Sequence, residues 1–98
     1  MHAVICKIKI HIPQNQSLKD KRRILKSIIT RLRNQYNISV AEVDDHDLWQ
    51  LATIGIGHVS NSQVSTAGNL VENILKFIRQ NYPEVEVIDH EAELMQGF

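Results

Sequence analysis

The sequence is poor in cysteine and contains no long apolar run. Cys6 is the single cysteine among 98 residues, which excludes an internal disulfide framework and makes the cytoplasm the expected compartment. No stretch approaches the roughly 20 apolar residues that a membrane span needs. Lys7 and Lys9 interrupt the early apolar run, so we expect no signal peptide either.

Sequence motifs of catalysis are missing as well. There is no glycine-rich phosphate loop and no recognisable Ser/His/Asp arrangement. We therefore expect no enzyme activity, no catalytic residues and no cofactor. The run Asp44-Asp45-His46-Asp47 offers oxygen and nitrogen ligands for a divalent metal, but four neighbouring polar residues are more typical of a turn, and no metal site is predicted.

Charge is balanced overall but unevenly distributed along the chain. Residues 1–41 contain nine Lys and Arg and one acid, whereas residues 42–98 contain two Lys and Arg and ten acids. Such asymmetry indicates either a half that binds a polyanion or two halves that intertwine and pair their charges. The length suits one domain, residues 1–98.

Hydrophobic periodicity predicts six elements in one domain. They are a strand over residues 1–12, a helix from Ser17 to about Gln35, strands over 37–43 and 48–59, a helix over 63–81 and an edge strand over 84–95. This βαββαβ order is typical of the ferredoxin-like α+β fold, with a four-stranded antiparallel sheet and two helices on one face. From the right-handed crossover rule we expect the first strand to run parallel to the third.

The first helix concentrates the positive charge. Residues 17–33 hold seven of the eleven Lys and Arg and a single acid, Asp20. Ser17 is suited to cap the helix, and Asp20 favours its positive end. At about 100° per residue, the apolar side chains share one arc and a basic stripe lies on another: Lys19, Arg22, Lys26 and Arg33.

This helix motivates the first functional hypothesis, a non-catalytic protein that binds RNA or the ribosome through phosphates. The second helix covers the same sheet with only Glu72, Lys76 and Arg79 charged, so folding does not require the excess. A basic face that is merely solvated is the competing explanation. The candidate phosphate-binding residues are Ser17, Lys19, Lys21, Arg22, Arg23, Lys26 and Arg33.

Lys21 is the exception in the helical pattern, because it falls inside the apolar arc in the first turn. Together with Lys19 and Arg22 it could hold a phosphate at the helix N-terminus. Alternatively, its methylenes pack on the sheet edge and its ammonium pairs with a carboxylate such as Glu42.

The alternative function is a structural module that forms a homo-oligomer or docks a protein partner through its open sheet face. That face carries Lys7 and Lys9 beside Thr53, without the aromatic rings typical of RNA-reading sheets. Trp49 either plugs one end of the core, which we favour, or anchors a subunit contact. The candidate interface residues are Trp49, Lys7 and Lys9. The uncovered face predicts self-association.

Five segments together resemble the YlxP-like family: Met1–Val4, Ser17–Arg23, Ser39–Val43, Asp47–Gln50 and Val59–Asn61. The joint spacing of S-L-K-D-K-R and D-L-W-Q is their most specific part. Members are small bacterial cytoplasmic proteins of unknown function, commonly encoded among transcription, translation-initiation and ribosome-maturation factors. The resemblance implies a ferredoxin-like fold and, by that association, a role linked to RNA or the ribosome, with no catalytic residues to carry over.

Overall fold

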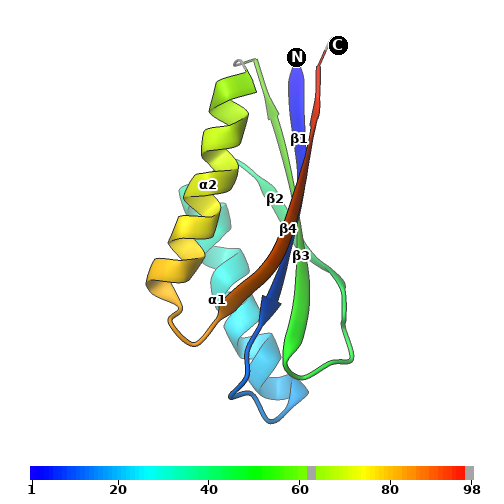
Figure 1. The fold of residues 1–98 in the computed structure, drawn as a ribbon, viewed down its shortest axis with the longest axis vertical. Coiled ribbons are helices and arrows are strands. Elements are labelled where there is room, and N and C mark those ends of the chain that lie inside the picture. Colours follow the sequence, from blue (N-terminus) through cyan, green and yellow to red (C-terminus); the bar gives the residue numbers. More distant parts are fainter. Residues whose placement is uncertain (62–63, 97–98) are drawn as a thin grey trace.

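The chain folds in the order β1-α1-β2-β3-α2-β4. The computed structural model describes residues 1–61 and 64–96. The elements are β1 His2–His11, α1 Leu18–Gln35, β2 Ser39–Asp44, β3 Leu51–Ser60, α2 Val64–Asn81 and β4 Glu86–Met95. Both helices lie on one side of the sheet (Figure 1), which confirms the predicted ferredoxin-like α+β fold. The expected start of α2 at Gln63 lies outside the described residues.

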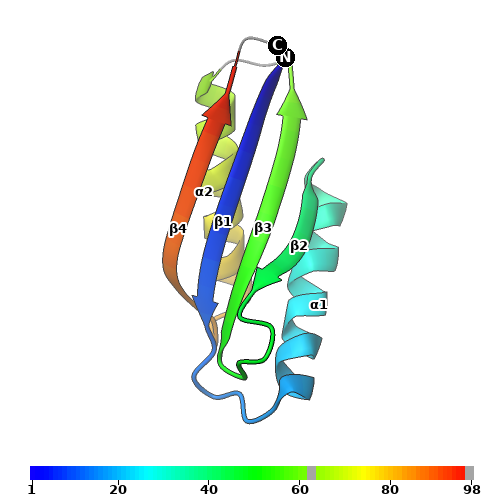
Figure 2. The ribbon, with the colours of Figure 1, turned by 90° about the vertical axis from the view of Figure 1, so that its right-hand side faces the viewer.

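The four strands form one sheet in the order β2-β3-β1-β4, so β4 is an edge strand as predicted. β1 and β3 are antiparallel neighbours, and the expectation that they run parallel is wrong. The right-handed crossover rule applies to strands that are joined through a helix. These are β1 and β2, which α1 joins and which both run antiparallel to the strand between them. Figure 2 shows the sheet face that neither helix covers.

A cap and an amphipathic surface define α1. The Ser17 hydroxyl accepts a hydrogen bond of 3.1 Å from the backbone N–H of Asp20, which satisfies one free donor of the first turn. Arg33 lies in the last turn, where its charge favours the negative end of the helix. The buried positions share one side of the helix: Lys21, Leu25, Ile28 and Leu32.

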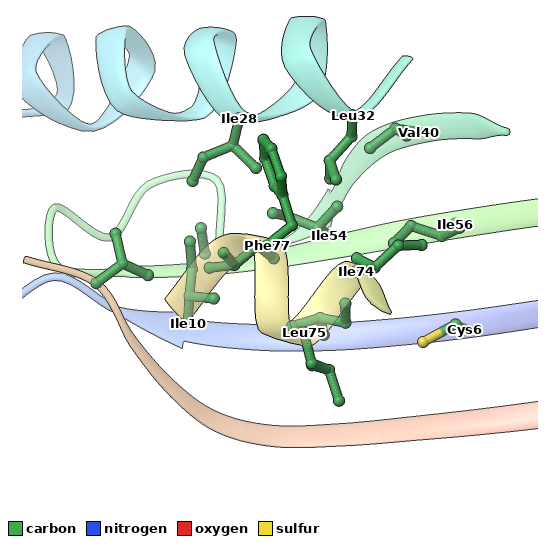
Figure 3. Packing of buried hydrophobic residues seen from close by; sticks show 14 of the residues in the cluster. Cys6, Ile10, Ile28, Leu32, Val40, Ile54, Ile56, Ile74, Leu75 and Phe77 are labelled. Carbon is green, nitrogen blue, oxygen red and sulfur yellow. The ribbon is translucent and has the colours of Figure 1, made fainter. Parts of the chain in front are cut away.

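The core fills the space between the sheet and the two helices (Figure 3). Ile8 of β1, Ile54 of β3 and Ile28 of α1 have no exposed surface, and Ile74 of α2 has 1%. Each such side chain stabilises the fold by about 1.5–3 kcal/mol relative to exposure. The core is therefore aliphatic at its centre, as the alternating strand pattern predicts.

The loop between β2 and β3 is longer than expected. The sequence predicts a strand that begins at Leu48, but β3 begins at Leu51 and residues 45–50 form a loop. Asp45 adopts a φ of 62°, in the left-handed region that Asp tolerates better than most residues. Apolar residues at 48 and 49 imitate a strand in the sequence, although Leu48 and Trp49 are both about half exposed in the structure.

Candidate nucleic-acid interface

Three cations form a continuous stripe on the solvent side of α1. Lys19, Arg22 and Lys26 occupy positions i, i+3 and i+7, and all three are exposed. Within residues 1–61 and 64–96, none of them has a hydrogen-bond or ion-pair partner. Because α1 has a single acid, this side of the helix carries positive charge that the fold itself does not neutralise.

Three other predicted phosphate-binding residues already have partners. Ser17 uses its hydroxyl for the helix cap. Arg23 lies 3.5 Å from the Asp20 carboxylate, although its side chain remains 80% exposed. Arg33 donates a 2.7 Å hydrogen bond from Nη2 to the Val40 carbonyl oxygen of β2. Arg33 is predicted as part of the stripe, but like Ser17 and Arg23 it uses part of its hydrogen-bonding capacity within the chain.

Lys21 is not a surface cation, and the phosphate-binding assignment made for it from the sequence is wrong. Its side chain is 1% exposed, and Nζ lies 3.1 Å from the Glu42 carboxylate. The ammonium donates hydrogen bonds to three backbone carbonyls of the β2–β3 loop region: Asp45 at 2.8 Å, His46 at 3.1 Å and Leu51 at 3.2 Å. With three protons given to carbonyls and one carboxylate balancing the charge, the burial of a lysine is compensated. The alternative prediction, in which Lys21 pairs with Glu42, is confirmed.

Sequence reasoning missed the role of Arg31. Its guanidinium donates to the Tyr82 hydroxyl at 3.2 Å and to the Asn81 side chain at 3.1 Å. It also lies 5.1 Å from the Phe77 ring centroid and 5.3 Å from that of Tyr82, within the range of cation–π attraction. Arg31 therefore joins α1 to the C-terminal end of α2. Its position at the edge of the apolar arc, on the side away from the basic stripe, is the sequence signal that indicates this role.

Asp45 connects the β2–β3 loop to the open sheet face. Its carboxylate accepts a 2.7 Å hydrogen bond from the Thr53 hydroxyl and lies 3.5 Å from Lys9 Nζ. The Thr53 hydrogen bond, with smaller contributions from the positive charges of Lys9 and Lys21, lowers the pKa of Asp45 against the opposing effect of burial. Within the described ranges, no group of three or more His, Cys, Asp or Glu side chains is placed to hold a metal ion.

Trp49 does not plug the core, and that prediction is wrong. Its side chain is 54% exposed, beside Leu48 at 45%. The loop that presents it is well anchored, since Gln50 donates from Nε2 to the carbonyls of Pro13 at 3.0 Å and Asn15 at 3.1 Å. A shallow hollow of about 490 Å³ lies here, and its lining residues are His11, Asp47, Leu48, Trp49, Gln50 and Leu51. An interface role for Trp49 stays a prediction.

The fold and its basic helix define a ferredoxin-like α+β domain with exposed cations along α1. Residues 3–92 match the model of a family described as "Protein of unknown function (DUF503)", and the chain belongs to this family. It is similar to "Uncharacterized protein YlxP" of Bacillus subtilis (strain 168), with 44% identity over 70 residues, which cover 71% of this chain and 74% of that protein. The family resemblance inferred from the sequence is confirmed.

A solved structure supports the architecture independently. The chain is similar to "De novo designed protein Foldit4", with a TM-score of 0.57 and 21% identity across 98% of this chain and 99% of that one. At this identity the similarity concerns the fold alone. Neither helix, over the part of the chain that the structure describes, is long and apolar enough to cross a membrane.

Proposed function

We propose that this protein is a non-catalytic, cytoplasmic RNA-binding protein that contacts phosphates through the exposed stripe of α1. The observation that carries the proposal is the alignment of Lys19, Arg22 and Lys26 on one solvent-facing side of the helix without acidic partners among the described residues. From Lys19 to Lys26 the helix rises about 10 Å at 1.5 Å per residue. A stripe of this length can face several phosphates of a nucleic-acid backbone at once.

The comparison between the two helices supports a role outside folding. α2 covers the same face of the sheet, and its charged residues, Glu72, Lys76 and Arg79, nearly balance. Both helices pack through apolar side chains, so packing gives no reason for α1 to be strongly basic. Surface cations that do not stabilise the fold are free to act in electrostatic binding.

The open sheet face favours phosphate contact over base reading. Sheets that read RNA bases usually present aromatic rings at the centre of the open face. Here β1 presents Lys7 and Lys9, and β3 presents Thr53, Gly55 and Gly57. Binding through α1 alone would recognise charge and shape with little sequence preference.

The surroundings of the cysteine favour a non-catalytic role. Cys6 is 2% exposed, and burial raises the pKa of its thiol, which keeps it protonated. A nucleophilic cysteine needs the opposite environment, with a depressed pKa and access for the substrate.

Two measurements test RNA binding. Capture of the tagged protein from its host, with and without RNase, should recover ribosomal RNA only without the nuclease. Filter binding of purified protein to a ribosomal RNA transcript over a salt series should then give a steep salt dependence. The double variant Lys19→Gln/Arg22→Gln should bind more weakly and lower the slope of log K against log salt by about 1.5, since each lost phosphate contact removes about 0.7–0.9.

The matched control is Lys76→Gln/Arg79→Gln, which removes two exposed cations from α2 instead. It should keep the affinity and slope of the parent protein. If the two double variants lose affinity equally, the stripe has no special role and only net charge matters. If the parent protein binds no RNA at low salt, the proposed function is wrong.

A further inference from the structure

The open sheet face consists of two unequal halves. Over β3, the chain covers its own sheet: a Cβ built on Gly55 would lie 2.6 Å from Val43 Cγ1, so the Val43 side chain occupies that space. Beside it, Asp45 bonds to Thr53, which is only 4% exposed. The β2/β3 half of the face is therefore covered at Gly55 and Thr53, by Val43 of β2 and Asp45 of the β2–β3 loop.

The β1/β4 half has no such cover and carries two columns of opposite charge. In the strand register, Lys7 of β1 stands opposite Glu91 of β4, and Lys9 stands opposite Asp89. Across the described residues, Lys7, Glu91 and Asp89 form no ion pair, and the partner of Lys9 is Asp45 on the other side. Positive and negative side chains thus form parallel columns along the strands, and most of them are not used within the chain.

Toward its other end the same half-face carries exposed apolar side chains beside one acid, Glu93. Ala3 lies opposite Met95 of β4 in the register, and Ile5 lies opposite Glu93, while Val59 belongs to the neighbouring strand β3. Val59 is 60% exposed, Ile5 49% and Met95 38%. A group of exposed apolar side chains on an uncovered sheet is typical of a surface that binds another protein.

We propose that the β1/β4 half of the open face binds a second copy of this chain about a two-fold axis parallel to the strands and between β1 and β4. Rotation about such an axis keeps each residue at the same height along the strands. It places β1 of one subunit against β4 of the other. Lys7 then faces the partner's Glu91, and the symmetry repeats this contact. In the same way Lys9 faces the partner's Asp89, and Ala3 faces the partner's Met95.

The charges on β1 and β4 favour this axis over a two-fold axis perpendicular to the strands. A two-fold axis that crosses the strands at the level of Lys7 and Lys9 would place β1 on β1 and bring the lysines of the two subunits together. Like charges opposite one another destabilise a contact. The inferred axis also leaves the β2/β3 half outside the interface, where Val43 and Asp45 cover Gly55 and Thr53 and would obstruct a flat approach.

The interface is small, so the dimer is weak and reversible. Two strands of ten residues, at about 3.3 Å per residue and about 4.8 Å between strands, present about 300 Å² of projected surface per subunit. This is well below the area of a standard stable interface, about 800 Å² per partner. We therefore expect dimers at high micromolar protein and low salt, whether or not RNA is bound.

Sedimentation velocity on two charge-reversed variants tests the dimer. The apparent mass of the parent protein should rise with concentration from the monomer value of 11.2 kDa toward twice that value. Lys7→Glu and Glu91→Lys, each alone, should dissociate at least about tenfold more readily, because each reversal converts two attractive contacts into repulsive ones. An equimolar mixture of both variants should dimerise again, since a mixed dimer restores both contacts between subunits.

The mixture separates contacts between subunits from contacts within one subunit. Each variant keeps its own cross-strand clash when the two are mixed, so recovery can come only from the contacts between chains. Lys76→Glu on α2 is the control and should dimerise like the parent protein. A parent protein that stays monomeric at high micromolar concentration, single variants that associate normally, or a mixture that does not recover would each overturn the proposal.

Cysteine crosslinking provides a second measurement if a charge variant does not fold. Ala3→Cys and Met95→Cys proteins, mixed and oxidised, should form a covalent mixed dimer faster than either variant alone. The native Cys6 is 2% exposed and does not compete. A mixture that crosslinks no faster than its components would contradict the inferred axis.

Discussion

Lys21 Nζ lies 2.8 Å from the carbonyl oxygen of Asp45, and this hydrogen bond fastens the β2–β3 loop to the first turn of α1. The carboxylate of the same Asp45 bonds to Thr53 on the open face of the sheet. The main chain of Asp45 is thus held from the helix side and its side chain from the other side. This double attachment stabilises a residue whose positive φ is itself unfavourable.

Replacement of Lys21 by methionine should destabilise the fold strongly. Methionine keeps the apolar stem, but it leaves three loop carbonyls and the Glu42 carboxylate without their cation. Removal of one partner from a buried ion pair costs about 3–5 kcal/mol. We expect a loss of about 3 kcal/mol in the free energy of unfolding, measured by urea denaturation.

Two further variants control this experiment. Arg22→Met changes the neighbouring exposed cation and should alter stability by no more than about 0.5 kcal/mol. Adding Glu42→Gln to Lys21→Met should recover part of the loss, because it removes the unpaired charge. Where it stays folded, Lys21→Met should bind RNA like the parent protein. Equal stability of Lys21→Met and the parent would show that the ammonium contacts contribute nothing.

Lys21 also shows how far the sequence alone leads. Periodicity fixes the face of α1 on which it lies and marks a lysine there as anomalous. The pattern contains no information on its partners, because the loop carbonyls come from residues 24 to 30 positions further along the chain. Local pattern identifies the helix and its Ser17 cap, which depend on neighbouring residues. The edge position of β4 is indicated by its acidic composition, although the strand order itself is a long-range property.

Trp49 is predicted to be buried, but its side chain is exposed. The sequence predicts that Trp49 lies in a strand that begins at Leu48 and plugs one end of the core. Anchors elsewhere in the chain, from Gln50 to Pro13 and Asn15, hold the segment in a loop and leave the ring exposed. Such long-range hydrogen bonds override strand propensity, which depends on context.

Thr53→Val should raise the pKa of Asp45 toward its ordinary value and weaken the fold in a pH-dependent way. A carboxylate whose pKa is lowered by folding stabilises the native state above its unfolded pKa, about 3.9, and this contribution disappears as the pH falls through the lower folded value. The free energy of unfolding of the parent should therefore exceed that of Thr53→Val by about 1–2 kcal/mol at pH 7. This difference should become smaller below about pH 3.9.

Urea denaturation across the pH range, with carboxyl NMR titration of Asp45, measures both effects. Thr30→Val on the exposed side of α1 is the control and should show no such convergence. A constant difference between the parent and Thr53→Val at all pH values would mean that the hydroxyl acts through packing alone.

Arg31→Met should weaken the attachment between the two helices. It removes the hydrogen bonds to Tyr82 and Asn81 and the cation–π contact, a loss of about 1–2 kcal/mol. Tyr82→Phe removes the shared hydroxyl, so the two losses should overlap, with a coupling energy of about 0.5–1 kcal/mol in a double-mutant cycle. Arg23→Met, which breaks only an exposed pair, should change stability by less than about 0.5 kcal/mol. Additive losses would exclude a direct link between Arg31 and Tyr82.

The glycines of β3 should respond differently to alanine, although both lie on the open face. A Cβ on Gly55 would meet Val43 Cγ1 at 2.6 Å, whereas a Cβ on Gly57 would meet Ile5 Cδ1 at an ordinary 3.8 Å. Valine is stiff about χ1 and cannot move aside freely. Gly55→Ala should therefore cost about 1–2 kcal/mol, and Gly57→Ala should be neutral or stabilising, since alanine reduces the entropy of the unfolded chain.

A compensating change identifies the cause of the Gly55 effect. If the clash with Val43 is responsible, Val43→Ala should reduce the cost of Gly55→Ala, and the two substitutions together should be less harmful than their sum. Thermal and urea unfolding of the four proteins in this cycle measure the coupling. Equal effects of alanine at 55 and 57, or an additive cycle, would show that Val43 moves away without cost and does not shelter this half of the sheet.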